Sequence, residues 1–178
     1  MQLLLCFSAA LIASAYACTN DPNGVQEKLY WTSCNTADVI QPTNLTVTDN
    51  HGNSNYPVDV SKPIVVTALS YSKSQTTYNS VLIDVTLRVW SKIFGCQWIT
   101  FPTFGLLNNI KQCSNCPLKP GPLTLIASVD LSKYAAIIDA VSSGTPYEIE
   151  VKYKNGDSSK HEEIACLLAG VVVLKPSK

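Results

Sequence analysis

The residues that could carry chemistry in this chain of 178 residues are its cysteines, its two histidines and its carboxylates. His51 lies in a turn-forming stretch and His161 lies beside two glutamates, and neither has the spacing of a metal ligand relative to a cysteine or a carboxylate. Cys113 and Cys116 have CxxC spacing, but the sequence holds no second such pair to complete a zinc site. We therefore expect no metal site and no cofactor.

Sequence motifs of known catalytic sites are also missing. The chain contains no Gly-x-Ser-x-Gly, no His-Glu-x-x-His and no phosphate-binding glycine loop. Glu148 and Glu150 alternate with apolar residues, so that they belong to the polar side of a strand rather than to an acid–base pair. These observations predict that the protein is not an enzyme.

The N-terminal sequence and the cysteines together predict export. Residues 2–17 carry no charge, and an apolar run leads into Ala-Tyr-Ala at 15–17, a pattern typical of a cleaved signal peptide. As a membrane anchor the run would be too short, because a spanning helix needs about 20 residues. Cleavage at 17 removes Cys6 and leaves an even number of cysteines, which predicts up to three disulfides. These are Cys18, Cys34, Cys96, Cys113, Cys116 and Cys166.

The distribution of charge excludes one class of partner. The thirteen basic and thirteen acidic residues cancel and form no long block, and nucleic-acid binding would require a clustered basic surface. No later apolar run reaches about 18 residues, so we expect a soluble mature chain. The sequon Asn44-Leu45-Thr46 predicts glycosylation of Asn44 at the surface.

Alternating apolar and polar residues predict several half-buried strands. Strands are expected at 44–49, 63–69 and 163–174, the last apolar on both faces as in a central strand. The clearest pattern, at 80–94, has on one face Val81, Ile83, Val85, Leu87 and Val89. Segment 147–153 repeats the pattern with Tyr147, Ile149, Val151 and Tyr153.

Turn signals and the order of the elements indicate the fold class. Residues 154–157 have Asn-Gly at their centre, which predicts a hairpin. Residues 130–141 show apolar residues at helical spacing behind a potential cap, so that either a short helix or an irregular edge is expected there. Short strands separated by turns, without strand–helix–strand alternation, predict an all-β sandwich.

Three aromatic residues lie in one segment whose composition is typical of a strand end followed by a loop. Residues 93–107 carry Trp98, Phe101 and Phe104 among glycine, proline and threonine. Aromatic side chains in such a loop either fold over the core or form the rim of an apolar cavity. The residues alone leave both interpretations open.

Four motifs in order resemble the ML lipid-recognition family, whose members include the ganglioside activator protein and the sterol carrier lost in Niemann–Pick type C disease. They are Tyr-Trp-Thr-Ser-Cys at 30–34, Cys-Pro-Leu-Lys-Pro-Gly at 116–121, the strand leader at 144–151 and Glu-Ile-Ala-Cys at 163–166. The likeness extends over residues 28–174. It departs from the family in the close spacing of Cys113 and Cys116 and in the presence of Cys18 and Cys96.

The resemblance implies an immunoglobulin-like β-sandwich of two antiparallel sheets that are splayed, with an apolar cavity between them for a lipid. It implies a Cys34–Cys166 disulfide and a cavity mouth near 98–107, formed by Trp98, Phe101 and Phe104. Together with the alternation, it makes the inward face of 81–89 one cavity wall and the partner face of 147–153, in the other half of the sandwich, the opposite wall. For the other cysteines, Cys113–Cys116 with Cys18–Cys96 is favoured, and the rival joins Cys96 to one of the CxxC pair.

The expected domain organisation is a signal peptide at 1–17, an extension at 18–27, the lipid-binding sandwich at 28–174 and a tail at 175–178. The expected function is non-enzymatic binding and transfer of a sterol, glycolipid or phospholipid in a secretion or in the lysosomal lumen. Its expected partners are the lipid, membranes that it contacts transiently, and a lysosomal hydrolase or a receptor. The alternative is an extracellular protein-binding sandwich with a packed core and no ligand.

Overall fold

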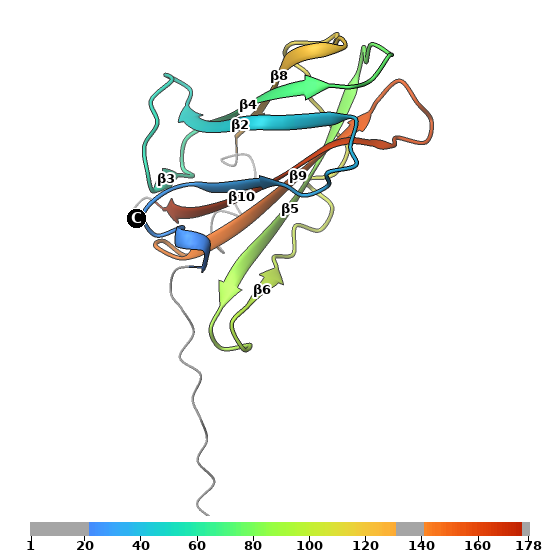
Figure 1. Cartoon of the computed structure of the whole chain (residues 1–178). Helices are drawn as coiled ribbons and strands as arrows, with labels where there is room; N and C mark the ends of the chain where they lie inside the picture. The colour runs from blue at the N-terminus through green and yellow to red at the C-terminus, as the bar shows by residue number, and fades with distance from the viewer. Residues whose placement is uncertain (1–21, 131–140, 176–178) are drawn as a thin grey trace, which may run out of the picture.

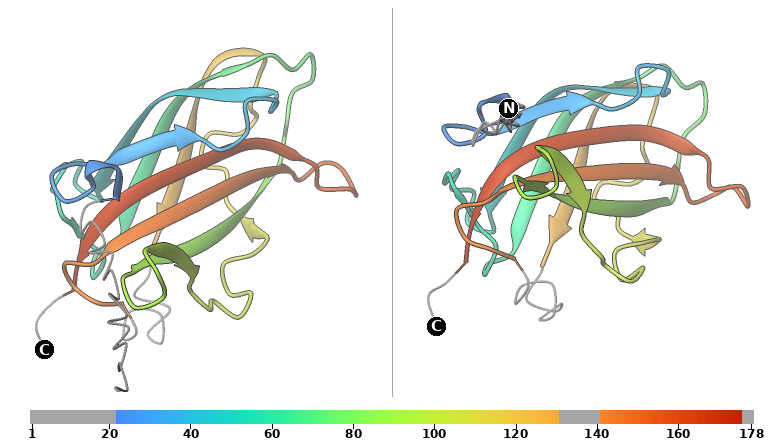
Figure 2. Two further views of the ribbon diagram at one scale, coloured as in Figure 1. Left: turned by 60° about the horizontal axis from the view of Figure 1, so that its bottom comes forward. Right: turned by 90° about the horizontal axis from the view of Figure 1, so that it is seen from below.

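The structure, a computed structural model, describes residues 22–130 and 141–175 and consists of two β-sheets packed face to face (Figures 1 and 2). The larger sheet has the order β1-β10-β9-β5-β6, with β3 added beside β10 and β7 beside β5. Its strands are β1 (Tyr30–Ser33), β10 (Glu163–Leu174), β9 (Pro146–Asn155), β5 (Val81–Ser91), β6 (Gln97–Thr100), β3 (Val58–Asp59) and β7 (Ile110–Lys111). The smaller sheet has the order β2 (Ile40–Asp49), β4 (Ile64–Ser72) and β8 (Gly121–Val129). Apart from the parallel contact of β3 with β10, the strand pairs are antiparallel, so the predicted all-β sandwich is confirmed.

The pairing register of β5, β9 and β10 follows from their alternating sequences. Leu87 lies opposite Ile149, and Ile149 lies opposite Ala169, so one row of apolar side chains crosses three strands. Val85 and Val151 continue into the next row. A shift by one residue would turn every one of these side chains to solvent, which is why the alternation fixes the register. Strand β10 lies between β1 and β9, as its apolar sequence predicts.

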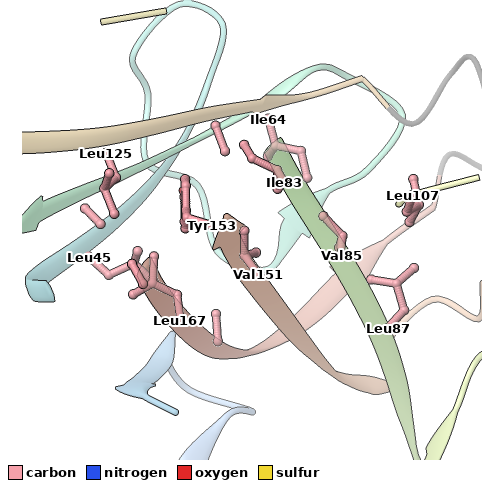
Figure 3. Close-up of a cluster of buried hydrophobic side chains, with 14 of the residues drawn as sticks. Leu45, Ile64, Ile83, Val85, Leu87, Leu107, Leu125, Val151, Tyr153 and Leu167 are labelled. Carbon is pink, nitrogen blue, oxygen red and sulfur yellow. The ribbon is translucent and has the colours of Figure 1, made fainter. Parts of the chain in front are cut away.

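The smaller sheet presents a second apolar face. In its central strand β4, Val66 pairs with Val47 of β2 and with Ala127 of β8. The register of β2 shifts between Pro42 and Asn44, a local irregularity that lets both ends of the strand keep their apolar residues inward. The two inner faces meet as the core of the sandwich (Figure 3).

One end of the core is tightly packed. Close to the turn between β9 and β10, large side chains from both sheets are at most 7% exposed to solvent. They are Ile40, Tyr78, Leu118, Leu125, Tyr153 and Ile164. None of them borders the cavities described below, so the sandwich is filled at this end and hollow towards the other.

Part of the predicted N-terminal extension packs onto the sandwich. The short 3₁₀ turn η1 (Pro22–Gly24) leads into Val25, which is fully buried. A Cβ on Gly170 would come within 2.7 Å of the Val25 Cγ1 atom, so glycine in β10 makes room for this contact. The Tyr56 hydroxyl accepts a hydrogen bond from the Val172 backbone N–H at 2.9 Å and donates to the Val25 carbonyl oxygen. Residues before β1 are thus tied to the larger sheet.

Several predictions concern residues outside the described ranges. These are the signal peptide at 1–17, Cys18, the helical or irregular segment for its part at 131–140, and residues 176–178 of the tail. Within the described residues, no helix is long and apolar enough to cross a bilayer.

Candidate functional site

The hollow end of the sandwich contains an apolar cavity of about 380 Å³ between the two sheets. Strands β5 and β9 form one wall, and strands β4 and β8 form the opposite wall. The residues that line it are Ile64, Val66, Ile83, Val85, Leu87, Leu107, Ile110, Lys111, Gln112, Ala127, Ser128, Asp130, Ile149 and Val151. In Figure 3, Ile83, Val85 and Leu87 follow one another along β5.

A smaller cavity of about 60 Å³ adjoins the first. The two share Ile64, Val66, Leu87, Ile149 and Val151 in their walls. The smaller one extends towards β2, β3 and β10 and is closed by apolar side chains. Its further lining residues are Leu45, Val47, Val58, Val60, Val141, Tyr147, Leu167, Ala169, Val171 and Val173. The two cavities are therefore neighbours on either side of a shared apolar wall, and the smaller one lies towards β10.

Half of the residues predicted for the site border one of these two cavities. Ile83, Val85, Leu87, Ile149 and Val151 line the main cavity, and Tyr147 lines the smaller one. Their side chains alternate along β5 and β9, and the cross-strand register places both sets on the inner face. No contact with a lipid is tested by this geometry, so their binding role stays a prediction.

The remaining three predicted wall residues lie elsewhere. Val81 and Tyr153, each 2% exposed, belong to the packed end. The Tyr153 hydroxyl is buried without a hydrogen-bond partner among the described residues, and this burial raises the pKa of the phenol well above its usual value. Val89 borders a separate surface hollow beside Trp90 and Pro146. The alternating pattern identified which side chains face inward. It did not identify where along the strands the close-packed core ends and the cavity begins.

The cavity reaches the surface at a polar border, and this border differs from the predicted mouth. Lys111 and Ser128 are exposed and Gln112 is half-buried. The Gln112 Nε2 atom donates a hydrogen bond to the Ser128 carbonyl oxygen at 2.7 Å, across the gap between β7 and the end of β8. Polar atoms therefore border one side of an otherwise apolar space.

The three aromatic residues of the predicted mouth do not border the cavity. Trp98 pairs with Trp90 across β5 and β6 with ring centroids 5.2 Å apart. Phe101 is partly buried against the core, and its backbone N–H donates to the Leu87 carbonyl oxygen at 2.7 Å. Phe104 is 89% exposed in the loop that follows. The residue of this segment that does line the cavity is Leu107, which is fully buried.

Sequence reasoning also missed the opposite wall. It placed 147–153 across the cavity from 81–89, but β9 and β5 are hydrogen-bonded neighbours in the larger sheet, so both segments belong to the same wall. Ile64 and Val66 fall within a predicted strand, but nothing in the chain marked them as facing β5 and β9. Ala127 lies in β8, which was not predicted because Gly121 and Pro122 at its start are turn residues by composition. The signal that could have revealed β8 is the spacing of Leu123, Leu125 and Ala127 at every second position, with Thr124 and Ser128 between and after them, although the apolar Ile126 interrupts the alternation.

The cysteines pair as favoured from the sequence wherever the structure describes both partners. Cys34 is bonded to Cys166 and Cys113 to Cys116. Cys96 is disulfide-bonded as well. Because its expected partner Cys18 lies outside the described residues, that third pairing stays a prediction.

The carboxylates singled out in the sequence form ion pairs on the outer face of the larger sheet. Arg88 contacts Glu148 at 2.6 Å between Nη1 and Oε1, and its Nη2 atom contacts Glu150. Lys152 continues the ladder to Glu150 and Glu163 at 3.4 and 3.2 Å. The carboxylates of Glu148 and Glu150 are both paired with cationic side chains, which supports a structural role for these two residues. No cluster of three or more histidine, cysteine or acidic residues that could hold a metal ion occurs in the described ranges.

Asn44, the predicted glycosylation site, is exposed on β2. It lies opposite Leu69 of β4, which is half exposed on the outer face of the smaller sheet. The site is therefore accessible, and its glycosylation remains a prediction.

Comparisons with known proteins gave likenesses in structure only. No family model matches the chain, and no curated protein matches it. Among solved structures, a Niemann-Pick type C2 protein from the Japanese carpenter ant has 14% identity and a TM-score of 0.48, with 82% of this chain and 99% of that chain covered. The C-terminal domain of Wzt has 8% identity and a TM-score of 0.45, with 85% and 81% covered. At these values neither likeness shows a family or a function, so the geometry of the chain itself must support any assignment.

Proposed function

We propose that the protein binds a lipid without catalysing a reaction, and that the apolar part of the lipid lies between the two sheets. The observation that carries this proposal is the cavity of about 380 Å³, whose walls come from the inner faces of both sheets. A protein interior is normally close-packed, and a hollow that stays empty forfeits contacts on all of its walls. A ligand that fills the hollow restores these contacts.

The chemistry of the lining favours a hydrocarbon ligand. An engineered apolar cavity of about 150 Å³ stays dry and binds benzene. The present cavity is larger, and away from its polar border it is lined by aliphatic side chains. Burial of an acyl chain or a sterol ring would contribute roughly 25 cal/mol for each Å² of apolar surface removed from water. The polar atoms of Lys111, Gln112 and Ser128 lie where a lipid headgroup would meet water. A sterol, a glycolipid and a phospholipid all have this division into an apolar body and a polar end.

The protein is further proposed to act outside the cytosol, in a secretion or in the lysosomal lumen, and to transfer its lipid between membranes or to a protein partner. Disulfides such as Cys34–Cys166 persist in oxidising compartments, which supports export. The alternative function, a protein-binding sandwich with a packed core, accounts for the packed end near Leu125 but gives no role to the hollow at the other end.

Filling the cavity tests the proposal. Ala127 is 2% exposed and lines the main cavity, so Ala127→Phe should place a ring in the space that the lipid needs. Ile126 is the neighbouring residue on the opposite face of β8, and Ile126→Phe is the matched control. Native mass spectrometry and solvent extraction of both purified variants would measure bound lipid.

We expect lipid on the parent protein and on Ile126→Phe, and little or none on a folded Ala127→Phe. Equal lipid content in all three proteins would place the lipid outside the cavity. A parent protein that carries no lipid, and takes up none from vesicles, would favour the packed-core alternative.

A further inference from the structure

The hairpin formed by β5 and β6 extends beyond the rest of the larger sheet. Strand β9 begins at Pro146 and pairs with β5 only as far as Val89, which lies opposite Tyr147. Past this point β5 pairs with β6 alone, through Trp90–Trp98 and Ser91–Gln97. Figure 1 shows the hairpin reaching past the ends of the neighbouring strands. Its turn, residues 92–96, is therefore the outermost part of this end of the sandwich.

Two large apolar side chains occupy the turn. Ile93 is 91% exposed and Phe94 is 66% exposed, the highest exposures in this hairpin among its large hydrophobic residues. The turn is held in shape by side chains of both strands. The Ser91 hydroxyl accepts a hydrogen bond from the Phe94 N–H at 3.2 Å, and Gln97 Nε2 donates to the Phe94 carbonyl oxygen at 2.8 Å. Cys96 is disulfide-bonded, which fixes the returning strand.

This turn, which we call the tip of the hairpin, has aromatic and charged residues near its two apolar side chains. Trp90 and Trp98 lie opposite each other in an edge-to-face pair, and both are half-buried. Lys92 is exposed beside the two apolar residues. The hairpin thus presents apolar side chains at its turn, with a cation and two indoles next to them. In a membrane, apolar side chains favour the hydrocarbon, whereas indoles and the charged ends of lysines favour the headgroup level.

We propose that the 92–96 turn is a membrane-docking element that inserts Ile93 and Phe94 into the outer layer of a lipid bilayer. A protein partner fits the geometry less well. Side chains of this size bury about 150–250 Å² each at most, whereas a stable protein interface needs about 800 Å² per partner. A narrow convex tip with two apolar side chains can enter a fluid bilayer without a complementary surface.

The docking element is separate from the lipid cavity but lies at the same end of the molecule. Leu87, a wall of both cavities, precedes the tip in the same strand. Insertion of Ile93 would therefore bring the hollow end of the sandwich towards the bilayer. The proposed membrane docking does not depend on a lipid in the cavity. Membrane docking and lipid binding in the cavity can therefore be disproved independently of each other.

Flotation of the protein with vesicles tests the tip. The double variant Ile93→Asp/Phe94→Asp should bind vesicles of phosphatidylcholine and phosphatidylserine at least about tenfold more weakly, because each large apolar side chain kept out of hydrocarbon forfeits about that factor or more. The matched control is Phe104→Asp/Leu106→Asp, which changes residues 89% and 50% exposed in the next loop. We expect the control to bind as the parent does. Binding of the tip variant at the parental level would overturn the proposal.

Tryptophan fluorescence provides a second, independent measurement. In a Trp31→Phe background the emission comes from Trp90 and Trp98 alone, since the chain has three tryptophans. Vesicles with brominated acyl chains should quench this emission when the tip inserts, and the tip variant should lose the quenching. Emission that is unchanged by brominated vesicles would also overturn the proposal. Native mass spectrometry of bound lipid, made on the same variants, reports on the cavity alone and so keeps the two proposals distinguishable.

Discussion

Cys34, directly after β1, and Cys166, in β10, are joined by a disulfide with their Cα atoms 5.3 Å apart and a sequence separation of 132. The Cys34 backbone N–H also donates to the Cys166 carbonyl oxygen at 3.3 Å. The bond therefore joins the first strand of the sandwich to the last, and the closed loop includes both walls of the cavity. A cross-link of this kind restricts the unfolded chain more than it changes the folded one.

Removal of this bond should lower the free energy of unfolding by roughly 4–5 kcal/mol, the chain-entropy value for so long a loop. The variant is Cys34→Ser/Cys166→Ser, measured against the parent by urea unfolding. Cys113→Ser/Cys116→Ser is a useful comparison, because that loop closes over a separation of only 3 residues and should matter far less. Similar losses in both double variants would contradict the entropic explanation.

Two leucines illustrate the difference between the packed part of the core and the part that contains the cavities. Leu125 is 1% exposed in the packed end, whereas Leu87 is 7% exposed and lines both cavities. Leu125→Ala should cost about 3–5 kcal/mol, because it opens a void in a filled region, while Leu87→Ala in lipid-free protein should cost less, because part of the surrounding space is already open. Added lipid should stabilise the parent more than Leu87→Ala. Equal losses in the lipid-free proteins would mean that the two sites are packed alike.

The strands that sequence alone predicts well are those whose two faces differ. Val85 and Val151 alternate with charged or polar neighbours, and the structure places both on the inner face in the predicted strands. The hairpin between β9 and β10 follows from Asn155-Gly156, although its connection runs on to Glu162. Strand β8 escaped prediction because it begins with glycine and proline, whose local preference for turns was outweighed by pairing with β4 along the whole strand.

The position of the cavity along the sandwich could not be predicted, because it depends on the distance between two sheets that are remote in sequence. Ile83 and Val81 have the same pattern, yet only Ile83 borders the hollow. The residues at the cavity mouth could not be predicted for the same reason. Phe101 and Phe104 are alike in sequence, but Phe101 packs on the core while Phe104 points to solvent, since the backbone hydrogen bond to Leu87 holds only the former against the sheet.

A buried carboxylate gives the stability of the fold a pH dependence. Asp38 is 7% exposed, and one of its oxygens has no hydrogen-bond partner among the described residues. Burial, and then the charge of nearby Glu163, raise the pKa of this carboxyl, although Lys152 and a backbone hydrogen bond oppose the shift. The folded state therefore binds the proton more tightly than the unfolded state, whose pKa is about 3.9.

The contribution of Asp38 to stability is thus complete below pH about 4 and is lost as the pH rises through the raised folded pKa. Asp38→Asn keeps an oxygen that can accept the hydrogen bond from Asn35 Nδ2 and removes the buried charge. We expect the variant to melt higher than the parent at pH 7, with a difference that shrinks as the pH is lowered towards 4. A difference that grows on acidification would show that the charged form of Asp38 is the stabilising one.

The two phenylalanines of the predicted mouth should respond in opposite ways to the same change. Phe104→Asp alters a side chain that is 89% exposed, so unfolding free energy should change by less than about 0.5 kcal/mol. Phe101→Asp places a charge among side chains of the core and should cost at least about 3 kcal/mol. The measurement is thermal unfolding of lipid-stripped protein, paired with transfer of a fluorescent lipid between vesicles. If Phe104→Asp is stable and transfers lipid as the parent does, the lipid enters at the border formed by Lys111, Gln112 and Ser128. If its transfer is impaired, Phe104 contacts the lipid during entry or exit. Collapse of Phe104→Asp would mean that its ring packs on the fold in solution.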